Sequence, residues 1–208
     1  MTLKDNKKEI RDWDTYYKEN NVEEMPWYES NLDPDLKKEI KSRNLSRGKF
    51  LDLGTGPGTQ ATQLSNLGFD VTGSDLSENA IKKAKNLSTK VNFVTDDFLN
   101  SKLPENEFDF IFDRGCFHIF DIDQRANYVT QIKRILGNNG ILFLKCMSIE
   151  EKELPEDEGP HKLSKSELKQ VFSNDFEMKT IKDTVFQGTL NQFPKALFTV
   201  LKKKSKPN

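Results

Sequence analysis

The stretch Phe50-Leu51-Asp52-Leu53-Gly54-Thr55-Gly56-Pro57-Gly58-Thr59 decides the fold. Its apolar start, from Lys49 to Leu53, predicts a buried strand, and the residues from Thr59 to Leu67 predict a helix. The glycine-rich turn between them lets the backbone approach a ligand closely, because glycine has no Cβ, and the helix start offers free N–H groups. Thr59 stands where a dinucleotide-binding fingerprint needs its third glycine. The turn therefore holds a ligand of another kind, or it is a tight connection that binds nothing.

Length and composition exclude several classes of protein. With 208 residues the chain is long enough for one domain with a substantial core. Its formal net charge of −1 favours neither nucleic acid nor an acidic membrane surface, and no apolar run approaches the ~20 residues that span a bilayer. The first residues lack the apolar segment of a signal peptide, and Cys116 and Cys146 form no C-x-x-C pair. We therefore expect a cytoplasmic protein with no nucleic-acid or membrane partner, either a monomer or a weak dimer.

Apolar runs and helical periodicity alternate along the rest of the chain. Further strands are predicted over residues 69–74, 91–95, 107–112, 141–147, 178–185 and 196–201, and further helices over 35–43, 77–84, 123–136 and 164–172. The residues from Gly137 to Gly140 are predicted to form a turn, and the last two strands are expected to pair antiparallel. Alternating β and α units of this kind predict an α/β fold in three layers.

Acidic residues follow the second and third predicted strands. Asp75 lies just past the strand over 69–74, where a carboxylate can accept hydrogen bonds from both hydroxyls of a ribose. Its alternative role is to cap the next helix, but Ser77 is itself a good N-cap and leaves Asp75 available for a ligand. Asp96 and Asp97 follow the third strand, where they either contact a ligand or are exposed acids of a turn.

The densest group of reactive side chains follows the strand over 107–112. It contains Asp113, Arg114, Cys116 and His118. In a parallel sheet the residues past a strand's carboxyl end face the ligand crevice. Arg114 either contacts a ligand or only pairs with a neighbouring carboxylate. His118 is either a base or orienting group for a substrate, or a partly buried histidine with structural partners, and Cys116 is expected to pack against the sheet.

The N-terminal segment is polar but carries aromatic side chains. Trp13 and Tyr17 are four residues apart and share a helix face, and Trp27 follows a proline. These aromatics either pack helices onto the sheet or form a lid. A lid would suit a cationic ligand, because aromatic faces attract cations and a covered site excludes water.

Together these motifs resemble the class I S-adenosylmethionine (SAM)-dependent methyltransferases. Asp52 followed by G-x-G-x-G is similar to motif I of that family, and the Asp-Arg-Gly triplet at 113–115 is similar to the thiopurine type. Cys-Phe-His at 116–118 resembles bacterial and archaeal small-molecule relatives. The N-terminal segment, with Pro26-Trp27, resembles the cover of thiopurine and tellurite-resistance methyltransferases.

The resemblance implies a fold and a domain plan. The expected fold is a Rossmann-like three-layer sandwich with a mostly parallel seven-stranded sheet. The whole chain, 1–208, is then a single methyltransferase domain, with an N-terminal helical cover over 1–45 and a catalytic core over 46–208.

The resemblance also assigns residues to the cofactor SAM. The motif I turn would hold its methionine part, Asp75 its ribose, and Trp27 would lie nearest the sulfonium. Asp97, or in second place Asp96, would accept a hydrogen bond from the adenine amino group. The implied cofactor-binding residues are Trp27, Asp52, Gly54, Thr55, Gly56, Gly58, Asp75, Leu76 (beside the adenine), Asp96, Asp97, Phe98 (covering the ring) and Asp113. The implied catalytic residues are Asp113, Arg114 and His118, and no metal site is expected.

The expected reaction is direct displacement of the methyl group of SAM by an acceptor. A thiol needs little help from a base, because its pKa of ~8.5 leaves it partly ionised near neutral pH. An amine or hydroxyl needs more, with His118 or Asp113 as candidate bases. We expect a small-molecule acceptor, with a weak preference for a thiol or related chalcogen. The alternatives are methylation of an amine, a hydroxyl or a protein, and a protein that binds SAM without catalysis.

Overall fold

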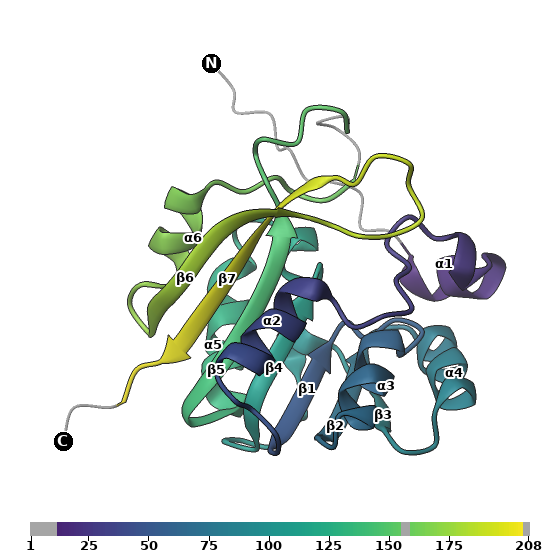
Figure 1. Cartoon of the computed structure of the whole chain (residues 1–208), viewed down its shortest axis with the longest axis horizontal. Helices are drawn as coiled ribbons and strands as arrows, with labels where there is room; N and C mark the ends of the chain where they lie inside the picture. Colours follow the sequence, from purple (N-terminus) through teal and green to yellow (C-terminus); the bar gives the residue numbers. More distant parts are fainter. Residues whose placement is uncertain (1–11, 155–158, 206–208) are drawn as a thin grey trace.

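A seven-stranded sheet forms the middle layer of the computed structural model, which describes residues 12–154 and 159–205 (Figure 1). The strand order is β3-β2-β1-β4-β5-β7-β6, and β7 runs antiparallel to both of its neighbours. The strands are β1 (Lys49–Leu53), β2 (Asp70–Asp75), β3 (Asn92–Thr95), β4 (Phe108–Arg114), β5 (Leu136–Met147), β6 (Phe176–Val185) and β7 (Lys195–Lys203). The predicted Rossmann-like sandwich with a mostly parallel sheet is confirmed.

Helices cover both faces of this sheet. The α-helices are α1 (Trp13–Glu19), α2 (Pro34–Ser42), α3 (Thr59–Asn66), α4 (Glu78–Leu87), α5 (Arg125–Ile135) and α6 (Lys165–Phe172). Short 3₁₀ helices are η1 (Val22–Glu24), η2 (Phe98–Asn100) and η3 (Phe117–Ile119). Apolar residues of α2, α3 and α4 pack on one face, and those of α5 and α6 pack on the other.

The sequence explains why both faces are covered. Neighbouring residues of one strand enter opposite layers, because successive side chains of a strand point to opposite faces. Phe50 and Phe112 contact the layer of α2, α3 and α4, whereas Leu51 and Ile111 contact the layer of α5 and α6. All four are fully buried, as expected of strands that read as continuous apolar runs.

One predicted turn is wrong, and several strand and helix ends shift by one to three residues. Gly137 to Gly140 do not form a separate turn but belong to β5, which begins at Leu136 directly after α5. The β4–β5 register shifts between Phe108 and Phe110, and Asn139 has a φ of 62°. The extra residues are therefore taken up as an irregularity within the ladder. Gly-Asn-Asn-Gly composition is typical of turns, and the pairing with β4 overrides it.

The strand order places the crevice of the sheet. β1 is followed by β2 on one side and lies beside β4 on the other, so the chain changes direction between β1 and β4. Ligands of open α/β sheets bind beyond the carboxyl ends of the strands at such a switch point. The connections after β1, β2 and β4 meet there, at the upper edge in Figure 1, together with the N-terminal cover.

The N-terminal cover lies across this edge. An acidic side chain fixes α1, because Asp14 accepts hydrogen bonds from Ser77 Oγ (2.9 Å) and from the main-chain N–H of Asn79 (2.9 Å). Asp33 caps α2, with its Oδ1 accepting the N–H of Asp35 at 3.0 Å. Residues 1–11 of the predicted cover lie outside the described residues. Within 12–154 and 159–205, no helix has the length and apolarity to cross a membrane.

We expect Gly58→Ala to destabilise the fold more than Gly68→Ala does. Both glycines have a positive φ, of +82° and +95°, so an alanine is strained at either position by about 1–2 kcal/mol. Only at Gly58 would the new Cβ also lie 2.7 Å from the ring of Phe93 and 2.8 Å from Cβ of Ala84. This overlap adds about 1–3 kcal/mol. Urea unfolding of the two variants measures the difference, and equal losses would contradict the packing around Gly58.

Candidate functional site

The glycine-rich turn and Asp75 form one hydrogen-bonded unit. Asp75 Oδ2 accepts the N–H of Gly56 at 2.8 Å, and Oδ1 accepts the N–H of Ser77 at 2.9 Å. Burial raises the pKa of Asp75 above its ordinary value. Ser77 caps α4 with its own side chain, which accepts the N–H of Ala80. The predicted division of labour between Ser77 and Asp75 therefore matches the geometry, although Asp75 also holds the turn.

Asp52 lies beneath the same turn. Its Oδ2 accepts hydrogen bonds from Thr55 Oγ1 (2.6 Å) and from the N–H of Ala61 (3.0 Å), and only 2% of the residue is exposed. Burial raises its pKa to about 7, against the lowering effect of these hydrogen bonds. Asp52 and Thr55 thus fix the shape of the turn from below, at the start of α3.

Aromatic side chains of the cover meet the turn from above. Tyr17 Oη lies 2.6 Å from the position that a Cβ on Gly56 would occupy, so only glycine leaves room there. The indole of Trp27 packs 5.8 Å from Trp13 and 5.6 Å from Tyr16 between ring centroids. Burial, with the nearby Asp75 charge, raises the pKa of Tyr17. The aromatic side chains of the cover therefore pack directly on the motif I turn, and their role as a lid stays a prediction.

The connection after β3 differs from the alignment-based expectation. Asp97 is exposed and caps η2, accepting the N–H of Leu99 at 3.2 Å. Asp96 Oδ2 is buried and has no hydrogen-bond partner in the described chain. A buried carboxylate oxygen without a donor is costly, and a bound ligand with a donor group would satisfy it. The geometry thus favours Asp96 over Asp97.

One neighbour of this connection also departs from expectation. Phe98 is 5% exposed and packs against Tyr128 in the main core, at 5.3 Å between ring centroids. It therefore does not extend from the surface as a cover for a ring. The side chain of Leu76, between β2 and α4, is 56% exposed, and its place beside the adenine stays a prediction.

Asp113 is saturated by donors of its own chain. Its Oδ1 accepts the N–H groups of Gly115 (3.1 Å) and Cys116 (2.7 Å), and its Oδ2 accepts the N–H of Phe117 (3.0 Å) and the hydroxyl of Tyr128 (2.6 Å). The residue is fully buried, and burial raises its pKa to about 6. These contacts correct the prediction that Asp113 acts on a ligand directly, because no lone pair is left for one. Instead it shapes the loop after β4.

Arg114 finds partners that sequence reasoning did not foresee. Its Nε donates to Asp33 Oδ2 (3.1 Å), Nη1 to the carbonyl of Trp27 (2.9 Å) and Nη2 to the carbonyl of Gln187 (2.6 Å). Of the two alternatives for Arg114, the structure shows pairing with a carboxylate, but that carboxylate is Asp33 and not one of its neighbours in the chain. Arg114 joins the end of β4 to the N-terminal cover and to the connection between β6 and β7.

His118 is held by the main chain. Its Nδ1 accepts the N–H of Met147 at 2.9 Å, and the residue is 8% exposed. An accepting Nδ1 is unprotonated, so the neutral ring carries its proton on Nε2 and has no lone pair left to take a proton from a substrate. This hydrogen bond opposes the predicted role as a general base. The geometry instead gives His118 a role in joining the loop after β4 to the end of β5.

Sequence reasoning missed a buried ionic cluster at the same edge. Lys145 is fully buried, and its ammonium contacts Asp33 Oδ2 (2.7 Å), Asp35 Oδ2 (2.9 Å) and Gln187 Oε1 (3.1 Å). The available signal was a lone lysine inside the apolar strand from Ile141 to Met147. A buried charge requires partners, so that lysine predicts an ionic cluster although not its members.

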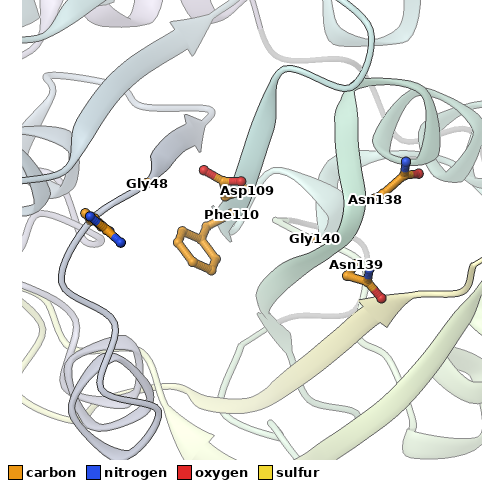
Figure 2. A pocket seen from close by; sticks show the side chains of 7 residues that line it. Gly48, Asp109, Phe110, Asn138, Asn139 and Gly140 are labelled. Atoms are coloured by element: carbon orange, nitrogen blue, oxygen red, sulfur yellow. The ribbon is translucent and has the colours of Figure 1, made fainter.

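A separate hollow lies at the opposite edge of the sheet. It has a volume of about 460 Å³ and is lined by Gly48, Asp109, Phe110 and residues 138–140 (Figure 2). These residues stand at the amino ends of β1 and β4 and in the irregular start of β5. Asp109 is already used there, because its Oδ2 accepts the N–H of Lys49 at 2.9 Å. None of the predicted site residues lines this hollow.

The fold and the crevice define a class I SAM-dependent methyltransferase, and the comparisons with known proteins agree. A family model described as a methyltransferase domain matches residues 50–140. An uncharacterized methyltransferase of Schizosaccharomyces pombe is 36% identical over 102 residues, which cover 47% of this chain and 70% of that protein. The chain therefore belongs to the SAM-dependent methyltransferase family, with SAM as its cofactor.

Other similarities extend over more of the chain. A probable thiol methyltransferase 2 of Arabidopsis thaliana is 26% identical over 152 residues, covering 70% of this chain and 66% of that protein. An EEF1A lysine methyltransferase 2 of Danio rerio is 26% identical over 130 residues, covering 56% of each. A solved structure from work on the conversion of a disulfide bond into a thioacetal group during echinomycin biosynthesis superposes with a TM-score of 0.80. It is 23% identical and covers 92% of this chain and 91% of that one, which supports the fold.

The residues present fit the cofactor on structural grounds. A Cβ added at Gly56 would lie 2.6 Å from Tyr17 Oη, so the turn requires glycine there. The N–H of Gly56 donates to Asp75 Oδ2 at 2.8 Å. The unpartnered Asp96 Oδ2 offers an acceptor next to it, because the N–H of Asp96 bonds the carbonyl of Asp75 at 2.9 Å. When bound, SAM supplies an activated methyl group. The protein itself would bind and orient the reacting groups and exclude water from them.

We expect Asp52→Asn to flatten the pH dependence of stability. The folded state raises the pKa of Asp52 from 3.8 to about 7, so it holds this proton more tightly than the unfolded chain does. Its contribution to stability is therefore complete below pH of about 4 and is lost as the pH rises to about 7, by about 4 kcal/mol at most.

An asparagine keeps the acceptor for Thr55 and Ala61 but has no proton to lose. The free energy of unfolding of the wild type minus that of the variant should fall between pH 4 and 8, as measured by urea unfolding. A constant difference across this range would show that Asp52 does not titrate as its burial requires.

Proposed function

We propose that this methyltransferase transfers the methyl group of SAM to a small thiol or related chalcogen nucleophile. The proposal rests on one observation, which is that both candidate bases, Asp113 and His118, already accept hydrogen bonds from their own chain. Asp113 accepts four hydrogen bonds from its own chain, and His118 already accepts one at the nitrogen that a base would use. An acceptor that must lose a proton to protein finds no free base at these positions.

A thiol suits a site without a base. With a pKa of ~8.5 a thiol is partly ionised near neutral pH, so the enzyme has only to align the thiolate with the methyl group. Alignment alone supplies ~7–11 kcal/mol in favourable cases. The thiol methyltransferase of Arabidopsis thaliana among the relatives supports this choice of acceptor.

For the cofactor we propose a division of roles among the residues of the crevice. Asp75 accepts from the ribose hydroxyls, the turn at Gly54 and Gly56 holds the methionine part, and Asp96 Oδ2 accepts from the adenine amino group. Asp52 and Thr55 keep the turn in shape. The aromatic cover around Trp27 encloses the sulfonium, where aromatic faces stabilise a cation.

The second candidate is transfer to an amine, supported by the EEF1A lysine methyltransferase 2 among the relatives. An amine is protonated near neutral pH, so this acceptor requires a route for its proton. Neither His118 nor Asp113 offers one in the observed arrangement. We therefore place the amine second.

We expect Asp75→Ala to weaken binding of S-adenosylhomocysteine more than tenfold, because the variant loses the acceptor for the ribose. Asp96→Asn should weaken binding by a smaller factor, since it loses the charge next to the adenine. Asp97→Asn is the matched control, and its affinity should stay within threefold of the wild type. Isothermal calorimetry measures all three, and an effect at Asp97 with none at Asp96 would reverse the proposed adenine contact.

We expect His118→Asn to retain methyl transfer to a thiol, because the Asn oxygen can accept the N–H of Met147 in place of Nδ1. His118→Ala removes that acceptor and should lose activity together with loop order. A labelled-methyl assay with benzenethiol and benzylamine as probes compares the variants. Amine transfer in the wild type that His118→Asn abolishes would show that His118 is a base and would refute the thiol proposal.

A further inference from the structure

The carboxylate of Asp33 is the centre of the buried ionic cluster. Asp33 is fully buried and accepts Lys145 Nζ (2.7 Å) and Arg114 Nε (3.1 Å) at one oxygen, while its other oxygen caps α2. Arg114 and Lys145 face each other in the register of β4 and β5. Two cations from adjacent strands therefore converge on one residue of the N-terminal cover.

The charges of Asp33 and Asp35 do not by themselves explain why Lys145 is buried here. Asp35 has its own cation in Lys182, whose ammonium lies 2.8 Å from Oδ1, and Asp33 has its own in Arg114. Against burial, the hydrogen bonds from Lys182, Thr184 and Lys145, together with the charge of Lys145, lower the pKa of Asp35 to about 2, so Asp35 keeps its charge and Lys182 is its largest stabilising partner. Lys145 is the third cation of this cluster and is fully buried, and burying a charge is costly. Lys145 Nζ also donates to Gln187 Oε1, which suggests a second role besides pairing with the two carboxylates.

Gln187 belongs to the connection between β6 and β7, which packs on the cover. Figure 1 shows this yellow-green segment curving across the upper edge of the sheet toward the turn after α1. The N–H of Thr189 donates to the carbonyl of Pro26 (3.3 Å), and Thr189 Oγ1 donates to the carbonyl of Met25 (3.1 Å). A Cβ on Gly188 would lie 2.0 Å from the Pro26 oxygen, so the two backbones are in direct contact.

Arg114 and Lys145 tie these two segments together from below. Arg114 donates to the carbonyls of both Trp27 and Gln187, and Lys145 contacts the side chain of Gln187. Both cations also lie over the ring of Phe186, at 5.5 and 5.7 Å from its centroid. We call residues 25–33 and 186–189 together the roof.

We propose that the roof closes over the acceptor end of the SAM site as one unit, and that Lys145 is the positioning residue that couples its two halves through Asp33 and Gln187. This inference rests on the proposed function, because it is SAM chemistry that needs a dry, closed site. A roof built from two distant segments brings Trp27 to the reacting centre only when both halves are seated. Lys145 is fully buried and its ammonium contacts Asp33, Asp35 and Gln187, so it acts through the roof.

Two variants separate this coupling from general stability. Lys145→Met leaves Asp33 with Arg114 and Asp35 with Lys182, so no carboxylate is left without a cation. Gln187→Leu keeps every charge and removes only the side-chain link. Lys49→Met is the matched control, since Lys49 pairs with Glu107 at 2.7 Å near the amino end of β1, away from the roof.

Amide hydrogen exchange, read by mass spectrometry with and without S-adenosylhomocysteine, tests the coupling. In the wild type the ligand should slow exchange in 25–33 and in 186–190. In Lys145→Met and Gln187→Leu, exchange in both segments should be at least tenfold faster with ligand bound, while residues 54–58 stay protected. Lys49→Met should match the wild type.

Faster exchange in one segment alone, or exchange in both within twofold of the wild type, would overturn the proposal. If circular dichroism shows that Lys145→Met is unfolded, Gln187→Leu decides by the same criteria. A wild type that fails to bind S-adenosylhomocysteine would refute the assigned cofactor site, and the ligand-free exchange would still test the coupling. Binding without transfer to benzenethiol would refute only the thiol acceptor.

Discussion

Several carboxylates are buried where the parallel strands end, and each of them needs hydrogen-bond donors or cations nearby. This need determines how the loops at this edge are arranged. Asp52 is matched by Thr55 and the start of α3, and Asp113 by the loop after β4 together with Tyr128. Asp75 is matched by the motif I turn and Asp33 by two cations. A buried carboxylate costs several kcal/mol unless hydrogen bonds satisfy it, so each one fixes the loop that supplies its donors.

The same need for donors supports the proposal that the site works by alignment more than by proton transfer. Carboxylates that fix loops are not available as bases, and the histidine of this edge accepts a main-chain N–H. Methyl transfer from SAM needs alignment and a dry environment, because the sulfonium is already an activated leaving group. Under the proposed function, the residues beyond the carboxyl edge and the aromatic cover would supply both, and an acceptor that ionises without help would suit them.

The sequence predicted the fold well because its apolar runs, its glycines and its helix caps all indicate the same elements. Apolar runs of five or six residues, glycine after the first strand and Ser77 before a helix all agree with the structure. The error at Gly137 to Gly140 arose where local composition and tertiary pairing disagree, since β4 provides a partner for residues that favour a turn. Phe98 was misjudged because its role was taken from the family resemblance, whereas in the structure it packs against Tyr128, 30 positions away in the chain.

The sequence by itself determined the order of elements, the motif I turn and the position of Asp75, because each depends on residues close together in the chain. Only the tertiary structure decided which side chains are free to act. Arg114 meets Asp33 across 81 positions and Lys145 meets it across 112. The donors that occupy Asp113 and His118 include Tyr128 and Met147, from other elements. Periodicity and propensity report on neighbours within a few residues, so they cannot show how charges from distant segments are paired when the sheet assembles.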